Sequence, residues 1–259
     1  MTSVPKVVIL CGGQGTRLRE ETEYRPKPLV PVGDAPILWH IMKIYSHHGF
    51  RDFVLCLGYK GRMIKEFFMD YEWDTFDFSM NLREKDRIWH KTHDTEDWNI
   101  TFANTGEYAL TGARVKAIKK YVGDNDFMLT YGDGVADVDI GALWEHHKQS
   151  GKMVTITCVH PVSKFGIVDV DDVRGDVAFV EKPPLKDWIA GGFMVCNAKI
   201  FDLLTDGMLE QDLLPKLAEQ GELSVYRHEG FWHAMDTYKD CLDLTKLWNE
   251  GNAPWKVWR

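Results

Sequence analysis

Short runs of β-branched and other apolar residues recur along the first half of the chain, and stretches with helical spacing separate them. Strand-like runs lie at 6–10, 53–57, 100–103 and 127–131, and helical spacing lies at 37–47, 62–69, 115–121 and 140–148. This alternation predicts an α/β fold in which a Rossmann-like, mostly parallel sheet is covered by helices on both faces. Ligands of such sheets bind outside the carboxyl ends of the strands, so we expect a site there.

The pattern changes twice along the chain. Residues 72–98 are charged and aromatic without a sustained period, which indicates an insertion: a mobile lid, an oligomer contact or a solvated surface loop. After Gly151 the strand-like runs 154–160, 166–170, 177–181 and 191–196 predict a small added antiparallel region. No Pro/Ser-rich linker or repeat interrupts the sequence, so one continuous domain over 1–259 is the simpler interpretation.

The composition and net charge argue against some kinds of binding partner. The formal net charge of −8 argues against a surface that follows nucleic acid phosphates, although local cations and one Mg²⁺ can still bind a small polyphosphate. Five cysteines, an odd number without a C-x-x-C pair, argue against a disulfide framework or a zinc site. No apolar stretch approaches the roughly 20 residues of a membrane span. We therefore expect a cytoplasmic protein with neither nucleic acid nor membrane as its partner.

A glycine-rich segment follows the first predicted strand. Gly12-Gly13-Gln14-Gly15-Thr16-Arg17-Leu18 lets the backbone approach a ligand and direct N–H groups at phosphate oxygens. It is not a Walker A loop, which needs Gly-Lys-Ser/Thr, and Leu18 stands where a dinucleotide fingerprint needs glycine. Arg17 and Lys27 add two cations for phosphate. A tight turn is the alternative for the loop alone.

Two carboxylates and one further lysine are candidates for the chemistry. Asp133, between glycines, follows the buried run 127–131, and Asp236 precedes a helical run at 238–248. A turn residue and a helix N-cap are the respective structural alternatives. Lys182, in a Glu-Lys-Pro segment, is the candidate partner for an acceptor phosphate, and a surface ion pair is its alternative.

These motifs, in this order, resemble the sugar-1-phosphate nucleotidylyltransferases. The segments are Gly12–Leu18 with Lys27-Pro28, Tyr131–Gly134, Glu181–Pro183, Gly191-Gly192 and Met235–Thr237. The resemblance spans nearly the whole chain. Residues 37–42, 58–61 and 253–256 are similar to the glucose-1-phosphate cytidylyltransferase branch in particular. It implies a nucleotide-binding part at about 1–150 and a sugar-phosphate part at about 151–259.

The resemblance also implies which residues act. In that family the two aspartates corresponding to Asp133 and Asp236 hold Mg²⁺ against the α-phosphate, which suits an ion that takes one or two carboxylates plus phosphate oxygens. The catalytic residues would be Arg17, Lys27, Asp133, Lys182 and Asp236. The nucleotide would contact Leu10, Gly12, Gly13, Gln14, Gly15, Thr16, Arg17, Lys27, Thr111, Gly112, Arg114, Gly132 and Asp133. The sugar phosphate would contact Tyr131, Glu181, Lys182, Ala190, Gly191, Gly192 and Asp236.

The same resemblance gives the expected substrates. The segment Thr111-Gly112-Ala113-Arg114 is similar to the T-G-x-R segment of cytidylyltransferases, so CTP and glucose 1-phosphate are expected, with a homo-oligomer (trimer or hexamer) and a role in supplying surface polysaccharide sugars. Ala190 departs from the family pattern I-N-G-G, and the segment before it is about one residue shorter. An asparagine could bind sugar hydroxyls where alanine cannot, so another sugar 1-phosphate stays open.

Three alternatives remain at this stage. One is the same reaction with UTP or dTTP. The second is a catalytically silent sugar-nucleotide sensor, against which the joint presence of Arg17, Lys27, Asp133, Lys182 and Asp236 argues. The third is an NAD-binding oxidoreductase, disfavoured by Leu18 and by the lack of a fitting acidic ribose partner about 20 residues further on.

Cytosine presents O2 and N3 as acceptors, and arginine has only donors, so Arg114 suits the cytosine edge. Replacing Arg114 with alanine should therefore raise the KM for CTP sharply in a steady-state assay. An unchanged KM would remove Arg114 from base recognition.

Overall fold

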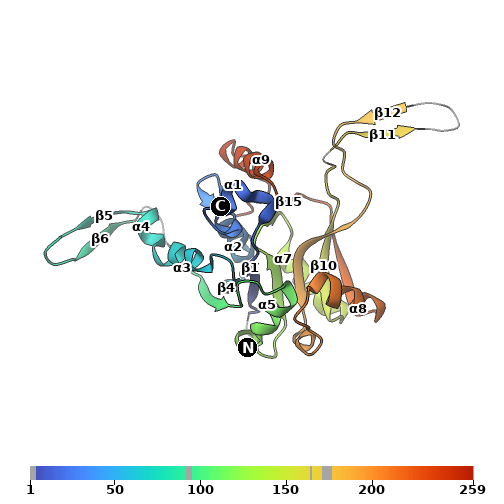
Figure 1. Ribbon diagram of the computed structural model, residues 1–259, viewed down its shortest axis with the longest axis horizontal. Helices are drawn as coiled ribbons and strands as arrows, with labels where there is room; N and C mark the ends of the chain where they lie inside the picture. Colours follow the sequence, from blue (N-terminus) through green and yellow to red (C-terminus); the bar gives the residue numbers. More distant parts are fainter. Residues whose placement is uncertain (1–3, 92–94, 164, 171–176, 259) are drawn as a thin grey trace.

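The computed structural model describes residues 4–91, 95–163, 165–170 and 177–258, and its centre is one seven-stranded sheet (Figure 1). In spatial order the strands are β14 (Leu223–His228), β10 (Val154–Val159), β13 (Ile189–Cys196), β8 (Phe127–Tyr131), β1 (Val7–Cys11), β4 (Asp52–Leu57) and β7 (Asn99–Asn104). Strand β13 runs antiparallel to both neighbours, and the other pairings are parallel. The predicted α/β fold with a mostly parallel sheet is confirmed.

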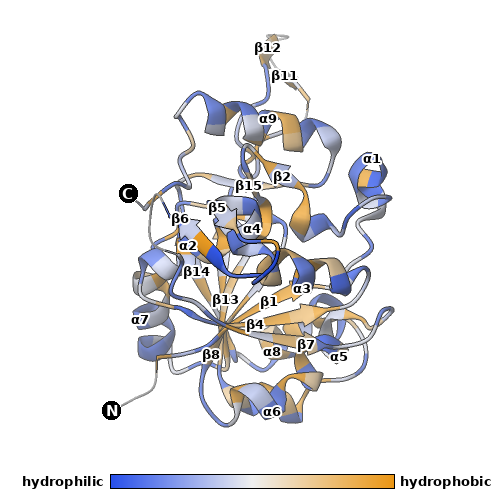
Figure 2. Cartoon of the chain, turned by 90° about the vertical axis from the view of Figure 1, so that its left-hand side faces the viewer, coloured by the Kyte–Doolittle hydropathy of each residue, from blue (hydrophilic) through white to orange (hydrophobic). Residues whose placement is uncertain are grey.

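Both faces of the sheet are covered by helices, as two buried clusters demonstrate. Along β1, Val7 and Ile9 belong to one cluster and Val8 and Leu10 to the other, because alternate strand residues point to opposite faces. The first face is covered by α2 (Ile37–His47), α7 (Ile140–Ser150) and α9 (Tyr238–Asn249). The second is covered by α5 (Thr111–Ala117), α6 (Lys119–Val122) and α8 (Leu214–Glu219). The central strands β1, β4 and β8 are strongly hydrophobic (Figure 2).

Shorter elements connect the layers and shape the carboxyl edge of the sheet. The helical ones are η1 (Thr16–Leu18), α1 (Arg19–Thr22), η2 (Lys27–Leu29), α3 (Gly61–Met69), α4 (Tyr71–Thr75), η3 (Ala198–Asp202) and η4 (Leu209–Leu213). Two small ribbons pair β2 (Pro31–Val32) with β3 (Ala35–Pro36), and β9 (Gly134–Ala136) with β15 (Trp232–Ala234). Among the described residues, no helix has the length and apolar character needed to cross a membrane.

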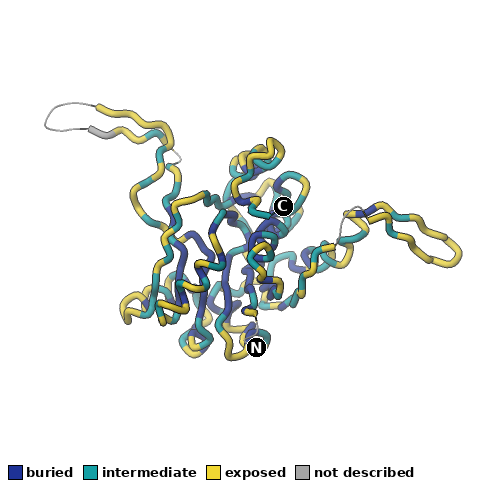
Figure 3. The backbone as a smooth tube through the Cα atoms, turned by 180° about the vertical axis from the view of Figure 1, so that it is seen from behind, coloured by how far each residue is buried: buried dark blue, intermediate teal, exposed yellow. Residues whose placement is uncertain are grey.

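Two exposed hairpins project from the body (Figures 1 and 3). One pairs β5 (Asp77–Met80) with β6 (Arg87–His90), and the other pairs β11 (Ile167–Val170) with β12 (Val177–Val180). The first lies in the predicted insertion 72–98, of which residues 92–94 are outside the described part. Trp73 packs on Phe78 with ring centroids 4.5 Å apart, and Phe78 on Trp89 at 5.0 Å. These aromatic contacts make the insertion an ordered hairpin where the sequence had no clear period.

A buried histidine joins α2 to the C-terminal segment. The His40 side chain is fully buried; its Nε2 lies 2.9 Å from the Val32 carbonyl oxygen, and its Nδ1 accepts from Trp255 Nε1 at 3.4 Å. This pair of contacts fits a neutral imidazole with its hydrogen on Nε2. Burial is the main cause that lowers the pKa of His40 to about 4.

The depressed pKa makes stability depend on pH. Below about pH 6.5 the unfolded chain binds a proton at His40 that the folded protein excludes until about pH 4, so acidification favours unfolding across that window. Between pH 7 and pH 5 this group should lower the free energy of unfolding by about 2 kcal/mol. Urea unfolding of wild type and His40→Gln at both pH values checks this, since the variant should lose that part of the pH dependence. An equal pH dependence of the free energy of unfolding in the two proteins would contradict this prediction.

Candidate active site

The glycine loop connects β1 to η1 at the carboxyl edge of the sheet. Gly15 has a φ of +63°, and a Cβ there would lie 2.7 Å from Thr22 Cγ2, so both the backbone and the available space require glycine. The Thr22 hydroxyl lies 3.1 Å from the Gly15 carbonyl oxygen and 2.9 Å from that of Leu18. These contacts fix the turn that places Thr16 and Arg17 at the mouth of a cleft.

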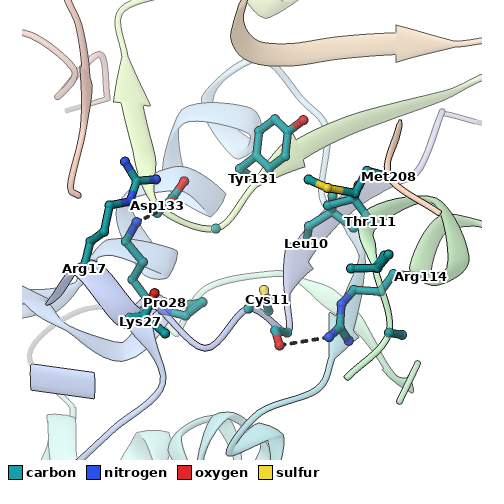
Figure 4. A pocket seen from close by; sticks show the side chains of 17 residues that line it. Leu10, Cys11, Arg17, Lys27, Pro28, Thr111, Arg114, Tyr131, Asp133 and Met208 are labelled. Atoms are coloured by element: carbon teal, nitrogen blue, oxygen red, sulfur yellow. Dashed lines mark hydrogen bonds and ion pairs between the residues drawn. The ribbon is translucent and has the colours of Figure 1, made fainter. Parts of the chain in front are cut away.

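A cluster of charged side chains lies at this edge of the sheet. Lys27 Nζ donates to Asp133 Oδ2 at 2.7 Å and to Asp236 Oδ1 at 2.9 Å. Arg17 Nη1 donates to the other oxygen of Asp236 at 3.0 Å. Figure 4 shows Lys27 and Asp133 pointing toward one another with Arg17 beside them. The structure thus brings together four of the five predicted catalytic residues.

The electrostatics of the cluster keep Lys27 charged. Its side chain is 12% exposed, and burial alone would lower the pKa of the ammonium group. The charges and hydrogen bonds of Asp133 and Asp236 outweigh burial and raise the pKa of Lys27 above its ordinary value. The cluster therefore contains a permanent cation between two carboxylates.

Backbone pairing explains how residues 133 and 236 meet. Gly132 follows β8 in a crowded position, where a Cβ would lie 3.0 Å from the Leu10 carbonyl oxygen. Strand β9 then pairs antiparallel with β15, with Gly134 opposite Ala234. The Met235 amide donates to the Asp133 carbonyl at 2.8 Å. This short ladder places the two aspartates side by side at the edge of the sheet.

The N-cap of α9 is Thr237, and Asp236 is the residue before it. The structural alternative for Asp236, a helix cap, is therefore wrong. Its carboxylate instead contacts Lys27 and Arg17.

A cleft of about 340 Å³ extends from the cluster along the ends of β1 and β8. The predicted nucleotide-binding residues that line it are Leu10, Gly12, Gly13, Gly15, Thr16, Arg17, Lys27, Thr111, Arg114, Gly132 and Asp133. Gln14 and Gly112 are not among the described lining residues. Gly112 instead donates its amide to the Gly207 carbonyl at 2.9 Å, which fixes the start of α5.

Arg114 is a buried residue that lines the cleft, and its guanidinium contacts several backbone oxygens, one of which Figure 4 shows. It donates at 2.9 Å to the carbonyl of Gly12, at 2.7 Å to that of Gly106 and at 2.9 Å to the Thr105 hydroxyl. Arg114 thus ties the glycine loop to the segment before α5, a role that the sequence did not indicate. Direct contact with a base stays a prediction, and its alanine variant would also lose these loop contacts.

Tyr131 also lines the cleft, and a carboxylate outside the predicted set holds it. The Tyr131 hydroxyl donates to Glu210, and the Thr111 hydroxyl donates to the other oxygen of Glu210 at 2.8 Å. Burial, followed by the charge of Glu210, raises the pKa of Tyr131. Glu210 therefore links the end of β8 to the start of α5, and no local sequence motif marks it.

A second cleft, of about 470 Å³, lies on the other side of the cluster. Asp236 and Lys182 both line it, so the fifth predicted catalytic residue faces the same space as one of the aspartates. Trp232 and His233 add an aromatic wall. Asp133 lines the first cleft and Asp236 the second, and Lys27 bridges these two carboxylates.

The remaining predicted sugar-phosphate residues divide into two groups. Gly191 and Gly192 are buried; Gly191 accepts from Trp232 Nε1 at 2.7 Å, and a Cβ on Gly192 would lie 3.2 Å from the Tyr131 ring. They support the aromatic walls of the two clefts. Glu181 and Ala190 are exposed and do not belong to the described lining of either cleft.

The residues that sequence analysis missed are mostly apolar or come from loops. In the first cleft they are Cys11, Pro28, Ala109, Leu110 and Met208. In the second they include Pro161, Ser163, Ile189, Trp232, His233 and Thr237. Proximity to Gly12, Thr111 and Asp236 in sequence could have indicated several of them. Met208 and Pro161 carry no such signal.

The acidic groups fit one kind of metal ion. In the described ranges, no group of three or more His, Cys, Asp or Glu side chains could hold an ion. Two carboxylates converge on a single ammonium group, however, so both lie within reach of one shared cation. Two hard oxygen donors suit Mg²⁺, which completes its shell with phosphate oxygens and water.

A glycine loop at the carboxyl edge of a mostly parallel sheet, with one of two paired aspartates on each of two clefts, is the arrangement expected of an α/β transferase that acts on phosphates. Residues 6–250 match the family model described as nucleotidyl transferase, and the chain belongs to this family. The resemblance seen in the motifs is thereby confirmed.

Individual relatives agree with this assignment. The chain is 47% identical over 256 residues to a protein of Bacillus subtilis (strain 168) named as a probable glucose-1-phosphate cytidylyltransferase, covering 98% of this chain and all of that one. It is 46% identical over 259 residues to the glucose-1-phosphate cytidylyltransferase of Salmonella typhi, covering 98% and 99%. The solved structure of HddC from Yersinia pseudotuberculosis superposes with a TM-score of 0.69 at 23% identity, over 94% and 99% of the chains, and shows the same fold.

Removing the shared ammonium should make the fold respond to a divalent ion. Lys27→Met leaves Asp133 and Asp236 without their common cation, which should cost about 1–3 kcal/mol of unfolding free energy in EDTA. Because Mg²⁺ can neutralise the same pair, it should restore more stability to this variant than it adds to wild type. Thermal or urea unfolding with EDTA and with Mg²⁺ measures both effects.

Lys43→Met is the matched control. Lys43 forms a similarly shielded ion pair, 2.9 Å from Glu96, but with a single carboxylate away from the clefts. Mg²⁺ should not restore stability to this variant. An equal response of both variants to Mg²⁺ would contradict the interpretation of the cluster.

Proposed function

We propose that this protein is a glucose-1-phosphate cytidylyltransferase, which makes CDP-glucose and pyrophosphate from CTP and α-D-glucose 1-phosphate. The observation that carries the proposal is that Lys27 bridges Asp133, which lines one cleft, and Asp236, which lines the other. One cleft suits a nucleotide and the other an acceptor phosphate. Relatives with 46–47% identity over nearly the full length support CTP and glucose 1-phosphate as the pair.

The reaction is an in-line displacement at the α-phosphorus of CTP. A phosphate oxygen of the sugar phosphate forms the new P–O bond while the bond to the bridging oxygen of the β-phosphate breaks, and pyrophosphate leaves with that electron pair. The attacking group is already an anion, so no general base is required. Catalysis then depends on positioning and on stabilisation of developing charge.

The cations of the two clefts divide these tasks. The glycine-loop amides and Arg17, at the mouth of the first cleft, hold the β- and γ-phosphates. Lys27, which bridges the two aspartates, stabilises the charge that develops on the α-phosphate. Lys182, on the second cleft, orients the phosphate of the acceptor. The residues up to about 150 thus serve the nucleotide, and those after it mainly serve the sugar phosphate.

Mg²⁺ is the expected cofactor, and Asp133 and Asp236 would hold it. It supplies positive charge to the phosphate oxygens during the displacement. Because the two aspartates line different clefts, an ion held by both would add positive charge near both substrates.

The choice of base and sugar depends on the walls of the clefts. The segment from Ala109 to Thr111 lines the first cleft and is the candidate wall for the cytosine base. Arg114 lines the same cleft and holds the preceding Gly106 carbonyl, so it supports this wall. Trp232 and His233 line the second cleft. Ala190 lies outside this wall, so its departure from the family pattern is compatible with glucose 1-phosphate.

We also infer a homo-oligomer in the cytoplasm. The β11–β12 hairpin exposes 66% of Val177 and 64% of Phe179, and a two-stranded hairpin is only marginally stable alone in water. Contacts with further copies would cover these side chains. All five cysteines are free thiols, which suits a reducing compartment.

The deciding experiment measures pyrophosphate release with CTP, UTP, dTTP and ATP, each paired with glucose 1-phosphate and other sugar 1-phosphates, with and without Mg²⁺. Release should require Mg²⁺ and be confined to CTP with glucose 1-phosphate. Asp133→Asn and Lys27→Ala should lower kcat by at least about a hundredfold, because each removes charge from the reacting centre. Arg62→Ala, which breaks an exposed ion pair with Glu66, serves as the surface control.

Each contrary outcome has a defined meaning. CTP with another sugar would keep the nucleotidyl transfer and replace the acceptor. Another nucleotide with glucose 1-phosphate would reject the base choice. Silence with every pair, together with tight binding of CDP-glucose, would reject the enzyme in favour of a sugar-nucleotide sensor.

A further inference from the structure

Asp240, on the first turn of α9, is bonded to the backbone of Asp236. Its Oδ2 accepts from the Asp236 amide at 3.1 Å, from the Thr237 amide at 2.7 Å and from the Thr237 hydroxyl at 2.8 Å. The Thr237 hydroxyl in turn accepts from the Asp240 amide at 3.3 Å, which completes a capping box. One carboxylate oxygen thus fixes the two residues at which the chain enters the helix.

The other oxygen of Asp240 faces the strand that leads to Asp236. Asp240 Oδ1 lies 3.3 Å from His233 Nε2, and His233 pairs in register with Val135 on β9. The Asp240 side chain is only 13% exposed. Asp240 therefore contacts both sides of the Asp236 turn: one oxygen accepts from the turn itself, and the other faces the strand before it.

An ordinary capping box would involve only Thr237 and Asp240. Here the additional bond to the Asp236 amide extends the cap to the residue whose carboxylate contacts Lys27 and Arg17. The opposite side of the turn is fixed by the bond from the Met235 amide to the Asp133 carbonyl. The Asp236 amide is shared between the Asp240 carboxylate and the Ala234 carbonyl, each at 3.1 Å. The backbone that carries the Asp236 carboxylate is thus held on both sides, by β15 and by α9.

We propose that Asp240 is a positioning residue that orients Asp236 to hold the divalent cation with Asp133. The inference rests on the proposed function. Partners of metal-binding groups typically change metal affinity by 10–100-fold when removed, although they do not touch the ion. Loss of Asp240 should therefore weaken the Mg²⁺-dependent part of nucleotide binding and leave the rest intact.

The test is calorimetric titration of CTP into the full chain, without sugar phosphate, in EDTA and in saturating Mg²⁺. In wild type the ratio of the two dissociation constants measures the contribution of the ion. Asp240→Ala should reduce this ratio about tenfold or more while leaving the CTP dissociation constant in EDTA within about a factor of two. Asp240→Asn keeps an acceptor oxygen for the Asp236 and Thr237 amides, so it should recover most of the ratio.

Asp139→Ala controls for simple loss of a helix cap. Asp139 caps α7 by accepting from the Ala142 amide at 2.8 Å and does not line either cleft. Both alanine variants should lower Tm by a few degrees. Only Asp240→Ala should change the ratio of the CTP dissociation constants in EDTA and in Mg²⁺.

The possible outcomes distinguish a failure of the positioning role of Asp240 from a failure of the proposed function. A Mg²⁺ ratio in Asp240→Ala equal to that of wild type would overturn the positioning role while leaving the proposed reaction untouched. An equal loss in Asp139→Ala would also overturn it, since the effect would then follow from lost stability. Wild type that does not bind CTP in either condition would reject the proposed function itself.

Discussion

The ammonium group of Lys27 lies between two carboxylates that would otherwise repel one another, and the arrangement of the active site depends on this contact. Asp133 follows a central strand, and Asp236 precedes the last helix. Lys27 lies 2.7 Å from one carboxylate and 2.9 Å from the other, and it stays charged although burial alone would tend to discharge it. Arg17, 3.0 Å from Asp236, brings a second positive charge, so two cations offset the two carboxylates.

The strand order brings the acceptor side to this cluster. Strand β13 is inserted antiparallel between β8 and β10, so residues after 150 share the sheet that ends in the glycine loop. Its glycines lie against Tyr131 and Trp232, which line the first and second cleft respectively. A single sheet thus supplies the walls of both clefts, without a hinge between separate sheets.

Much of the central fold could be predicted because periodicity is a local property. Helix α2 at Ile37–His47 and strand β8 at Phe127–Tyr131 have the predicted bounds. Strand β14 could not be predicted because it is half-exposed. The β5–β6 hairpin could not be predicted because it is ordered by contacts among Trp73, Phe78 and Trp89. Local sequence does not encode such pairings.

The residues of the site also divide into those that the sequence could identify and those that it could not. Arg17, Lys27 and Asp133 belong to motifs, so sequence identified them as candidates, and the structure brings them together with Asp236. The contacts of Arg114 with backbone carbonyls and of Glu210 with Tyr131 are tertiary. They depend on how distant loops approach, and no spacing rule expresses that. The capping box was hidden for another reason: an aspartate before a helix suggests a cap, while the actual cap is the next residue, Thr237.

The bridge that Lys27 forms between the two carboxylates also bears on how the proposed Mg²⁺ would be exchanged. Many metalloproteins need the ion in order to fold, because their ligands cannot remain together without it. Here a side chain of the same chain bridges the carboxylates, so an ion is not needed to keep them together. The Mg²⁺ proposed for this site would then be able to arrive and leave with the phosphates of each substrate and product.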